Sequence, residues 1–371
     1  MREDVGQLLW IGFEEPTVPA DVRARLDAGR AGATVLFKRN LVLARDAASS
    51  QEVCNLDALD ALVRDLHRAA PDGTPALVSV DQEGGLVQRV RAPATQWPPM
   101  FAHDGLPAGE DVQVAERVGR ALGDELRALG FDVDFAPVLD VHTNAQNPVI
   151  GERAFGRDAD TVARRALAFA RGLDAAGVIA CGKHFPGHGD TDTDSHLELP
   201  RVDHAWERLE RVELAPFRRA AEAGMPMLMT AHVVFAALDR ERPATLSPAV
   251  VDGLLRGKLG FRGVIVSDDL DMKAISGHFG ADHAAVAAVR AGCDVLLLCR
   301  DEHNQLLAEE GLVREAERDS ELRRRIGESA ARVRELKRAH AAKVAGLPPV
   351  SRDVVGSFEH RRLADRLAGR A

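Results

Sequence analysis

The sequence lacks the long apolar runs and the basic stretches that would assign it to a membrane or to nucleic acid. No apolar run in the 371 residues approaches the about 20 residues of a membrane-spanning helix. The N-terminal segment Met1–Gln7 has no basic-then-apolar layout of a secretion signal, so we expect a cytoplasmic protein. The formal net charge is −9, and the arginines alternate with acidic residues, as in Asp319–Arg325. This charge distribution argues against nucleic acid as the partner.

Cysteine is also scarce. The four cysteines form neither a CxxC motif nor a paired framework; they are Cys54, Cys181, Cys293 and Cys299. Cys293 and Cys299 fall on one predicted strand, where six steps of about 3.3 Å hold them roughly 20 Å apart, beyond disulfide reach. The sequence therefore predicts buried free thiols in a reducing compartment.

Strand-like and helix-like segments alternate along most of the chain. The apolar, strand-like runs are Leu8–Phe13, Ala33–Phe37, Ala76–Val80, Val133–Val138, Val178–Cys181, Met227–Thr230, Gly263–Val266 and Asp294–Leu298. The amphipathic stretches between them are Glu52–Ala69, Val112–Leu129, Thr161–Ala176, Trp206–Ala223 and Ala281–Ala291. Eight strands separated by helices favour an α/β protein built as a single (β/α)8 TIM-type barrel over an open doubly wound sheet.

The last part of the chain is predicted to extend the barrel with helices. Residues 301–343 are helical in pattern and highly charged, and Gly346-Leu-Pro-Pro349 stops that pattern. We therefore expect a catalytic barrel over residues 1–345. A short arginine-rich tail over 346–371 is too small for a domain and is expected to pack on the barrel or to fray.

Polar residues recur where six of the predicted strands end. They are Lys38-Arg39-Asn40, Asp81, Asp140 with His142, Lys183-His184, His232 and Ser267-Asp268-Asp269. In a parallel barrel all of these positions lie at the C-terminal mouth, where the active site of the fold is found. The recurrence predicts one polar site rather than six unrelated surface loops.

The densest of these segments is the loop Gly182–His196. Its fifteen positions hold three histidines, three aspartates, a lysine and three glycines. A structural loop has a use for the glycines but none for so many titratable groups, so we interpret this loop as functional.

The strand Gly263–Val266 leads into a second candidate segment of the active site. Asp268 follows the apolar run almost at once, so its carboxylate is expected to point into the mouth and to take part in catalysis. Asp269 and Asp271 follow as the chain turns toward a helix, and for these two we expect helix capping.

An earlier strand repeats the arrangement around Asp81, whose carboxylate is suited to accept hydrogen bonds from ligand hydroxyls. The pair Gly84-Gly85 allows the backbone to approach closely, and Arg89 adds a fixed cation. A further loop after a strand offers Arg153.

Taken together, these segments resemble the bacterial β-N-acetylglucosaminidases of glycoside hydrolase family 3, the NagZ type. The resemblance runs from about Gly6 to Arg300 and rests on five motifs. They are Lys183-His-Phe-Pro-Gly-His-Gly-Asp-Thr191 with Asp194-Ser-His196, Ser267-Asp-Asp-Leu270, Val80–Arg89, Phe135-Ala-Pro-Val-Leu-Asp140 and Ala291-Gly-Cys-Asp294. It implies a barrel enzyme that needs no metal or cofactor and removes N-acetylglucosamine from cell-wall-derived saccharides, with retention of configuration, in peptidoglycan recycling.

The resemblance also implies a role for individual residues. Asp268 matches the nucleophile, His196 the general acid/base and Asp194 the carboxylate partner of that histidine. The residues that match the binding site of the non-reducing sugar are Asp81, Arg89, Arg153, Lys183 and His184. To His188 and Asp190 we assign loop shaping rather than chemistry.

The chemistry agrees with these roles. A retaining glycosidase needs a carboxylate that attacks the anomeric carbon and a group that protonates the leaving oxygen. Histidine is unusual in the second role, but its pKa starts in the right range, and the negative charge of Asp194 favours the imidazolium that the first step needs. After that step the neutral ring of His196 can activate water.

Two other reactions fit parts of the pattern. A histidine acid/base does not repel phosphate, so the same site suits a phosphorylase that uses phosphate as acceptor. The histidines and aspartates of the loop also suit a metal-dependent barrel hydrolase, although their spacing matches no short zinc motif. In each case we expect a small saccharide or muropeptide as substrate, a monomer, and no nucleic-acid or membrane partner.

Overall fold

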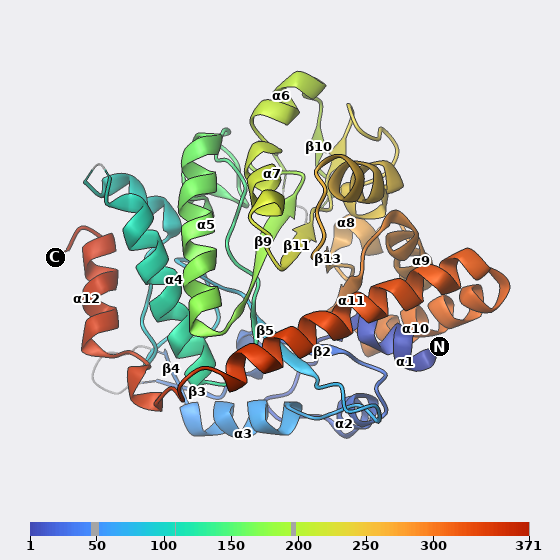
Figure 1. Cartoon of the computed structure of the whole chain (residues 1–371), viewed down its shortest axis with the longest axis horizontal. Coiled ribbons are helices and arrows are strands. Elements are labelled where there is room, and N and C mark those ends of the chain that lie inside the picture. Colours follow the sequence, from blue (N-terminus) through green and yellow to red (C-terminus); the bar gives the residue numbers. More distant parts are fainter. Residues whose placement is uncertain (46–51, 108, 194–197, 371) are drawn as a thin grey trace.

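A closed barrel of parallel strands forms the centre of the protein (Figure 1). The computed structural model describes residues 1–45, 52–107, 109–193 and 198–370. Within these ranges, eight strands close in the order β1-β14-β13-β11-β9-β8-β5-β2. They are β1 Leu9–Ile11, β2 Ala33–Leu36, β5 Leu77–Val80, β8 Val133–Asp134, β9 Ile179–Phe185, β11 Met227–Thr230, β13 Val264–Asp269 and β14 Val295–Leu298.

Helices follow these strands in turn and cover the outside of the barrel, which confirms the predicted (β/α)8 class (Figure 1). The α-helices are α1 Arg2–Leu8, α2 Ala20–Asp27, α3 Leu56–Leu66, α4 Asp111–Ala128, α5 Ala159–Ala176, α6 Trp206–Arg211, α7 Ala215–Glu222, α8 Lys273–Ser276, α9 Ala281–Ala291, α10 Glu302–Arg318, α11 Ser320–Ala345 and α12 Phe358–Leu367. Short 3-10 turns lie at η1 Lys38–Asn40, η2 Met100–Gly105, η3 Gly151–Arg153, η4 Ala244–Leu246 and η6 Arg352–Val354, and a π-helix at η5 Ala249–Lys258.

Each of the eight predicted strands is present, but two of them are longer than their apolar runs. Strand β9 continues to Phe185, which pairs with Thr230, and β13 continues to Asp269, which pairs with Leu297. Ladder pairing uses backbone groups, so a strand can extend beyond its apolar run. The prediction was wrong at Leu8, which ends helix α1, and at Val212, which separates α6 from α7.

Among the described residues, three two-stranded sheets lie outside the barrel, and none of them was predicted. They are β3 (Leu43–Arg45) with β4 (Glu52–Cys54), β6 (Gln82–Gly84) with β7 (Val87–Gln88), and β10 (Arg201–Val202) with β12 (Val234–Phe235). Strands of two or three residues are too short to show an alternating pattern in the sequence.

The barrel interior is filled by apolar side chains and is closed at its lower end by α11. Trp10 packs near Phe135 inside the barrel, at 6.3 Å between ring centroids. Val333 and Leu336 of α11 join the same cluster. Lys337, one turn further, donates to Gln7 Oε1 at 2.7 Å and to the carbonyl of Gly32 at 2.6 Å. Figure 1 shows α11 running across this end of the barrel.

The tail beyond residue 345 carries η6 and α12. Helix α12 packs against α4 and η2, on the opposite side of the barrel from α10 (Figure 1). His360 Nδ1 lies 2.8 Å from Glu125 Oε1, which also accepts the backbone N–H of Gly356 at 3.0 Å. Within the described ranges, no helix is long and apolar enough to cross a membrane.

All four cysteines are buried and free of disulfides, as predicted.

Asp294 anchors α11 and η5 to the start of β14, at the end of the barrel opposite the mouth. Its fully buried carboxylate is contacted by the guanidinium groups of Arg256 and Arg332. It also accepts from Ser329 Oγ at 2.8 Å and from the backbone N–H of Ile265 at 2.9 Å. The motif that ends at Asp294 therefore serves the fold rather than the mouth.

We predict that Asp294→Asn lowers the free energy of unfolding by about 3–5 kcal/mol, because the buried Arg256 charge loses its partner. Asp203→Asn is the matched control. Its carboxylate pairs with Arg201 where both side chains are exposed, so it should cost under about 1 kcal/mol. Urea denaturation of the two variants measures the difference; similar midpoints would contradict the structural role of Asp294.

Candidate active site

A pocket of about 360 Å³ lies at the C-terminal ends of the barrel strands. We call it the mouth pocket. Six of the predicted site residues line it; they are Asp81, Arg89, Arg153, Lys183, His184 and Asp268. These residues come from four different strands or the loops that follow them, so the fold brings together groups that are up to 187 residues apart, from Asp81 to Asp268. The other two, Asp194 and His196, lie outside the described residues.

Two carboxylates and three cations form a continuous chain of ion pairs along one wall. Arg89 donates to Asp81 Oδ2 at 3.0 Å, and Lys183 Nζ donates to Asp81 Oδ1 at 2.7 Å. The same ammonium lies 2.6 Å from Glu83 Oε1, and Arg153 binds both oxygens of Glu83 at 2.8 Å. Glu83 and Lys183 are each 3% exposed, so the centre of this charge chain is shielded from water.

The ion pairs shift the pKa values of Asp81, Glu83 and Lys183. Burial alone would raise the pKa of Asp81, but the Lys183 ammonium and the Arg89 guanidinium outweigh it and hold that pKa well below its usual range. For Glu83, burial acts in the same upward direction, and Arg153 and Lys183 lower the pKa to about 2. Burial lowers the pKa of Lys183, yet Asp81 and Glu83 raise it above its ordinary value. Asp81, Glu83 and Lys183 therefore stay ionised at neutral pH.

The hairpin β6–β7 returns Arg89 to Asp81. Gly84 and Gly85 turn the chain with φ of +101° and +58°. A Cβ on Gly84 would lie 2.8 Å from the carbonyl oxygen of Pro98, so side chains are excluded there. The close backbone approach predicted for this glycine pair is present, and it is made with the protein's own Trp97–Pro99 segment.

A further buried carboxylate, that of Asp140, holds the loop after β9 in place. It accepts the Nδ1 proton of His184 at 2.7 Å and the backbone N–H of His188 at 2.7 Å. His184 lines the mouth pocket and uses Nδ1 for Asp140, which leaves Nε2 as the ring nitrogen for a ligand. Burial would raise the pKa of Asp140, but the two histidines lower it.

His188 and Asp190 make contacts that hold the loop in place. His188 Nδ1 lies 2.7 Å from Thr191 Oγ1, and burial lowers the pKa of His188 to about 4, so its ring is neutral. Asp190 accepts from Thr143 Oγ1 at 3.0 Å and contacts His204 Nε2. His188 nevertheless lines the mouth pocket, within reach of a ligand.

Asp268 lies at the end of β13 and faces the mouth pocket. Its Oδ1 accepts the backbone N–H of Asp269 at 2.8 Å. That contact fixes one carboxylate oxygen, and the carboxylate is suited to attack a carbon held in the pocket.

The helix-capping prediction for Asp269 and Asp271 was wrong. Helix α8 has no side-chain cap. Asp269 Oδ1 instead accepts the N–H groups of Asp271 and Cys299, both at 3.1 Å, and Asp271 Oδ2 accepts the N–H of Arg300 at 2.9 Å. The two aspartates thus bind the neighbouring β14–α10 connection. Burial and the Asp271 charge raise the pKa of Asp269 to about 7.

Not every strand-end residue reaches the mouth pocket. Lys38 pairs with Glu52 at 2.5 Å, and Asn40 is buried against the carbonyls of Phe13 and Glu15. His232 Nε2 lies 3.0 Å from the carbonyl oxygen of Asp269, which places it against strand β13.

Two carboxylates were given no role by the sequence. Glu83 lies two positions from Asp81 and was not singled out, and Asp140 was expected at the mouth only as one of the strand-end polar residues. Both support residues of the pocket without lining it, and a single sequence offers no sign of such indirect contacts.

Comparisons with known proteins show which family the chain is similar to. Residues 1–336 match the family described as "Glycosyl hydrolase family 3 N terminal domain". A relative from Pseudoalteromonas piscicida, "Beta-hexosaminidase A", is 33% identical over 373 residues, which cover 95% of this chain and 60% of the relative. The chain thus spans three fifths of that protein's length.

Solved structures show the same similarity. A family 3 β-N-acetylglucosaminidase from Paenibacillus sp. superposes with a TM-score of 0.89 at 40% identity, over 100% of this chain and 68% of that one. Native NagZ from Neisseria gonorrhoeae gives 0.77 at 32% identity, over 99% and 98%. The barrel, its strand-end carboxylate and these matches show that the chain belongs to glycosyl hydrolase family 3.

Proposed function

We propose that this protein is a retaining exo-β-N-acetylglucosaminidase that removes the non-reducing terminal sugar from cell-wall-derived saccharides. The observation that carries the proposal is the position of Asp268, which shares one pocket with Arg89, Asp81, Lys183 and Arg153, the four pocket-lining members of the ion-paired chain. An attacking carboxylate and a rigid set of polar groups for sugar hydroxyls are what a retaining glycosidase needs.

In the first step, an oxygen of Asp268 bonds to the anomeric carbon as the bond to the leaving sugar breaks. The imidazolium of His196 gives its proton to the leaving oxygen, and Asp194 holds the ring in place. In the second step, water attacks the anomeric carbon, the neutral His196 ring takes a proton, and Asp268 is released as a carboxylate.

The ion-paired chain, together with His184, binds the sugar that is released. Asp81 accepts from sugar hydroxyls, while Lys183, Arg89, Arg153 and His184 donate to hydroxyl oxygens. Because these groups are already fixed by one another, little conformational entropy is lost when the sugar binds.

We place this activity in peptidoglycan recycling in the cytoplasm. The support is the similarity to NagZ and the four buried cysteines, none of which forms a disulfide. Free thiols are characteristic of a reducing compartment.

Phosphorolysis is the second candidate, and the cations of the mouth pocket favour it. Arg300 lines the rim, and its side chain makes no ion pair with any carboxylate of the described residues. Assay with nitrophenyl β-N-acetylglucosaminide in phosphate and in a zwitterionic buffer separates the two reactions. We expect free N-acetylglucosamine at equal rates; a sugar 1-phosphate product would favour the phosphorylase.

The nucleophile assignment predicts that a fluorinated N-acetylglucosamine analogue becomes covalently attached to Asp268, because a slowed second step lets the ester accumulate. Peptide mass spectrometry of the inactivated protein locates the label. Asp269→Asn is the matched control and should still be labelled at Asp268. A label on any other residue would overturn the assignment.

The acid/base assignment predicts that Asp194→Asn lowers turnover by about 10²- to 10⁴-fold. Loss of the negative charge also lowers the pKa of the neighbouring imidazole, so the alkaline limb of the kcat/KM profile should move to lower pH. The profile is measured with nitrophenyl β-N-acetylglucosaminide. Undiminished turnover with an unchanged profile would refute the dyad.

Glu83 is predicted to act as a positioning residue for Lys183 and Arg153. Glu83→Gln should raise KM several-fold and change kcat less, because sugar binding depends on where these cations lie. Since the folded-state pKa of Glu83 is lowered to about 2, its contribution to stability is present above about pH 4.3 and is lost as the pH falls toward 2. The variant should therefore show a flatter acid-denaturation curve over that window; an identical curve with unchanged KM would contradict this role.

A further inference from the structure

The C-terminal tail, residues 346–370, has no part in the chemistry proposed above, yet buried polar contacts tie it to the barrel. Its helix α12 lies beside α4 (Figure 1). Just before α12, Gly356 has a φ of +65°, and a Cβ there would lie 1.9 Å from the carbonyl oxygen of Pro93. The tail backbone therefore packs directly on the segment that leads to Trp97.

One carboxylate, that of Glu125 on α4, joins the tail to this segment. On the tail side, its Oε1 accepts the backbone N–H of Gly356 at 3.0 Å and lies 2.8 Å from His360 Nδ1. On the other side, it accepts the hydroxyl of Thr95 at 2.5 Å and the backbone N–H of Thr95 at 3.0 Å. Glu125 is 4% exposed and Thr95 is 1% exposed. These bonds are shielded from water, so losing one leaves a buried group unpaired.

The same segment holds the β6–β7 hairpin. Gln88 Nε2 donates to the carbonyl of Thr95 at 2.7 Å, and Gln88 Oε1 accepts the N–H of Trp97 at 3.1 Å. The N–H of Gly85, at the turn of the hairpin, donates to the carbonyl of Trp97 at 2.8 Å. Thr95 and Trp97 therefore fix both the turn of the hairpin and its second strand.

The hairpin carries a residue of the sugar site. Gln88 precedes Arg89, which lines the mouth pocket and donates to Asp81 at 3.0 Å. Hydrogen bonds thus lead from residue to residue, from His360 in the tail to the neighbour of Arg89. A shift of the hairpin would move Arg89 away from the position in which it meets a sugar hydroxyl, and small displacements of binding groups are costly.

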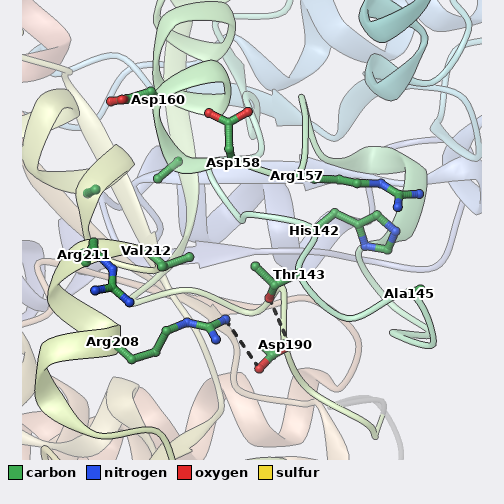
Figure 2. Close-up of a pocket in the computed structure, with 12 residues that line it drawn as sticks. His142, Thr143, Ala145, Arg157, Asp158, Asp160, Asp190, Arg208, Arg211 and Val212 are labelled. Atoms are coloured by element: carbon green, nitrogen blue, oxygen red, sulfur yellow. Dashed lines mark hydrogen bonds and ion pairs between the residues drawn. The ribbon is translucent and has the colours of Figure 1, made fainter.

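The loop after β9, which also lines the mouth pocket through His188, is held by other residues. Asp190 of this loop accepts from Thr143 Oγ1 at 3.0 Å and lies 3.8 Å from Arg208 of α6 (Figure 2). Neither of these two partners belongs to the tail or to the segment before Trp97. The loop therefore serves as an internal reference for any effect that spreads from the tail.

We infer that Glu125 and His360 are positioning residues for the sugar site, which hold the β6–β7 hairpin, and with it Arg89, in the place that sugar binding requires. This inference rests on the proposed glycosidase activity, because it gives the tail a role in binding the sugar of that reaction. Loss of the contact should raise KM and change kcat little, since neither residue meets the reacting atoms.

Steady-state kinetics with nitrophenyl β-N-acetylglucosaminide test the inference. We expect Glu125→Gln and His360→Ala to raise KM about three- to tenfold, with kcat changed by less than about twofold. His360→Asn should keep KM near that of wild type, because its amide N–H can replace Nδ1 as the donor to Glu125. The matched controls are Glu116→Gln on α4 and Arg362→Gln on α12, both exposed, and they should leave KM unchanged.

A double-mutant cycle separates positioning from a general loss of stability. If the tail acts through Arg89, Glu125→Gln should add little to the rise in KM that Arg89→Gln causes, whereas independent effects multiply. Multiplied effects would overturn the inference, as would an unchanged KM in both Glu125→Gln and His360→Ala. His360 is partly exposed, so His360→Ala should fold even if Glu125→Gln does not.

Hydrogen–deuterium exchange with mass spectrometry tests the connection apart from catalysis. Residues 82–90 should exchange faster in His360→Ala than in wild type, while residues 186–193 of the loop after β9 should not change. Equal exchange of residues 82–90 in the two proteins, or faster exchange of both segments, would contradict the inference. If wild type cleaves no substrate, the proposed function fails, and the exchange measurement still decides whether the tail holds the hairpin.

Discussion

Five charged side chains are held against one another in the barrel mouth, and the geometry of the site depends on them. Asp81 and Glu83 each bridge two cations, with Lys183 shared between them. Removing these charges from water is costly, and partners of opposite sign within hydrogen-bond distance offset that cost. The same contacts fix the donors and acceptors before a sugar arrives. The same ion pairs therefore stabilise the mouth pocket and hold its polar groups in place for a ligand.

Other buried carboxylates organise the regions around this centre. Asp140 holds His184 and the start of the loop that follows β9, while Asp294 fastens α11 and η5 below the barrel. Neither carboxylate lines the mouth pocket. Acidic residues in the motifs of this chain thus divide into those that line the mouth pocket and those that hold other parts of the fold in place, and only the fold distinguishes the two sets.

The barrel could be predicted from the sequence because eight apolar runs, most of them followed by a helical pattern, leave few other folds open. Six mouth residues could be predicted for a related reason, since parallel strands bring their polar ends to one rim. The helix-capping prediction for Asp269 and Asp271 was wrong because their partners, at Cys299 and Arg300, lie about thirty residues away in sequence. Glu83 was missed for a similar reason: its contact with Arg153 crosses 70 positions.

The central claim is that the ion-paired chain holds a terminal sugar next to Asp268. A crystal structure with bound N-acetylglucosamine tests it most directly. We expect the sugar hydroxyls on Asp81, Lys183 and His184, with the anomeric carbon about 3–3.5 Å from a carboxylate oxygen of Asp268. A sugar bound elsewhere, or one whose anomeric carbon faces away from Asp268, would contradict the account.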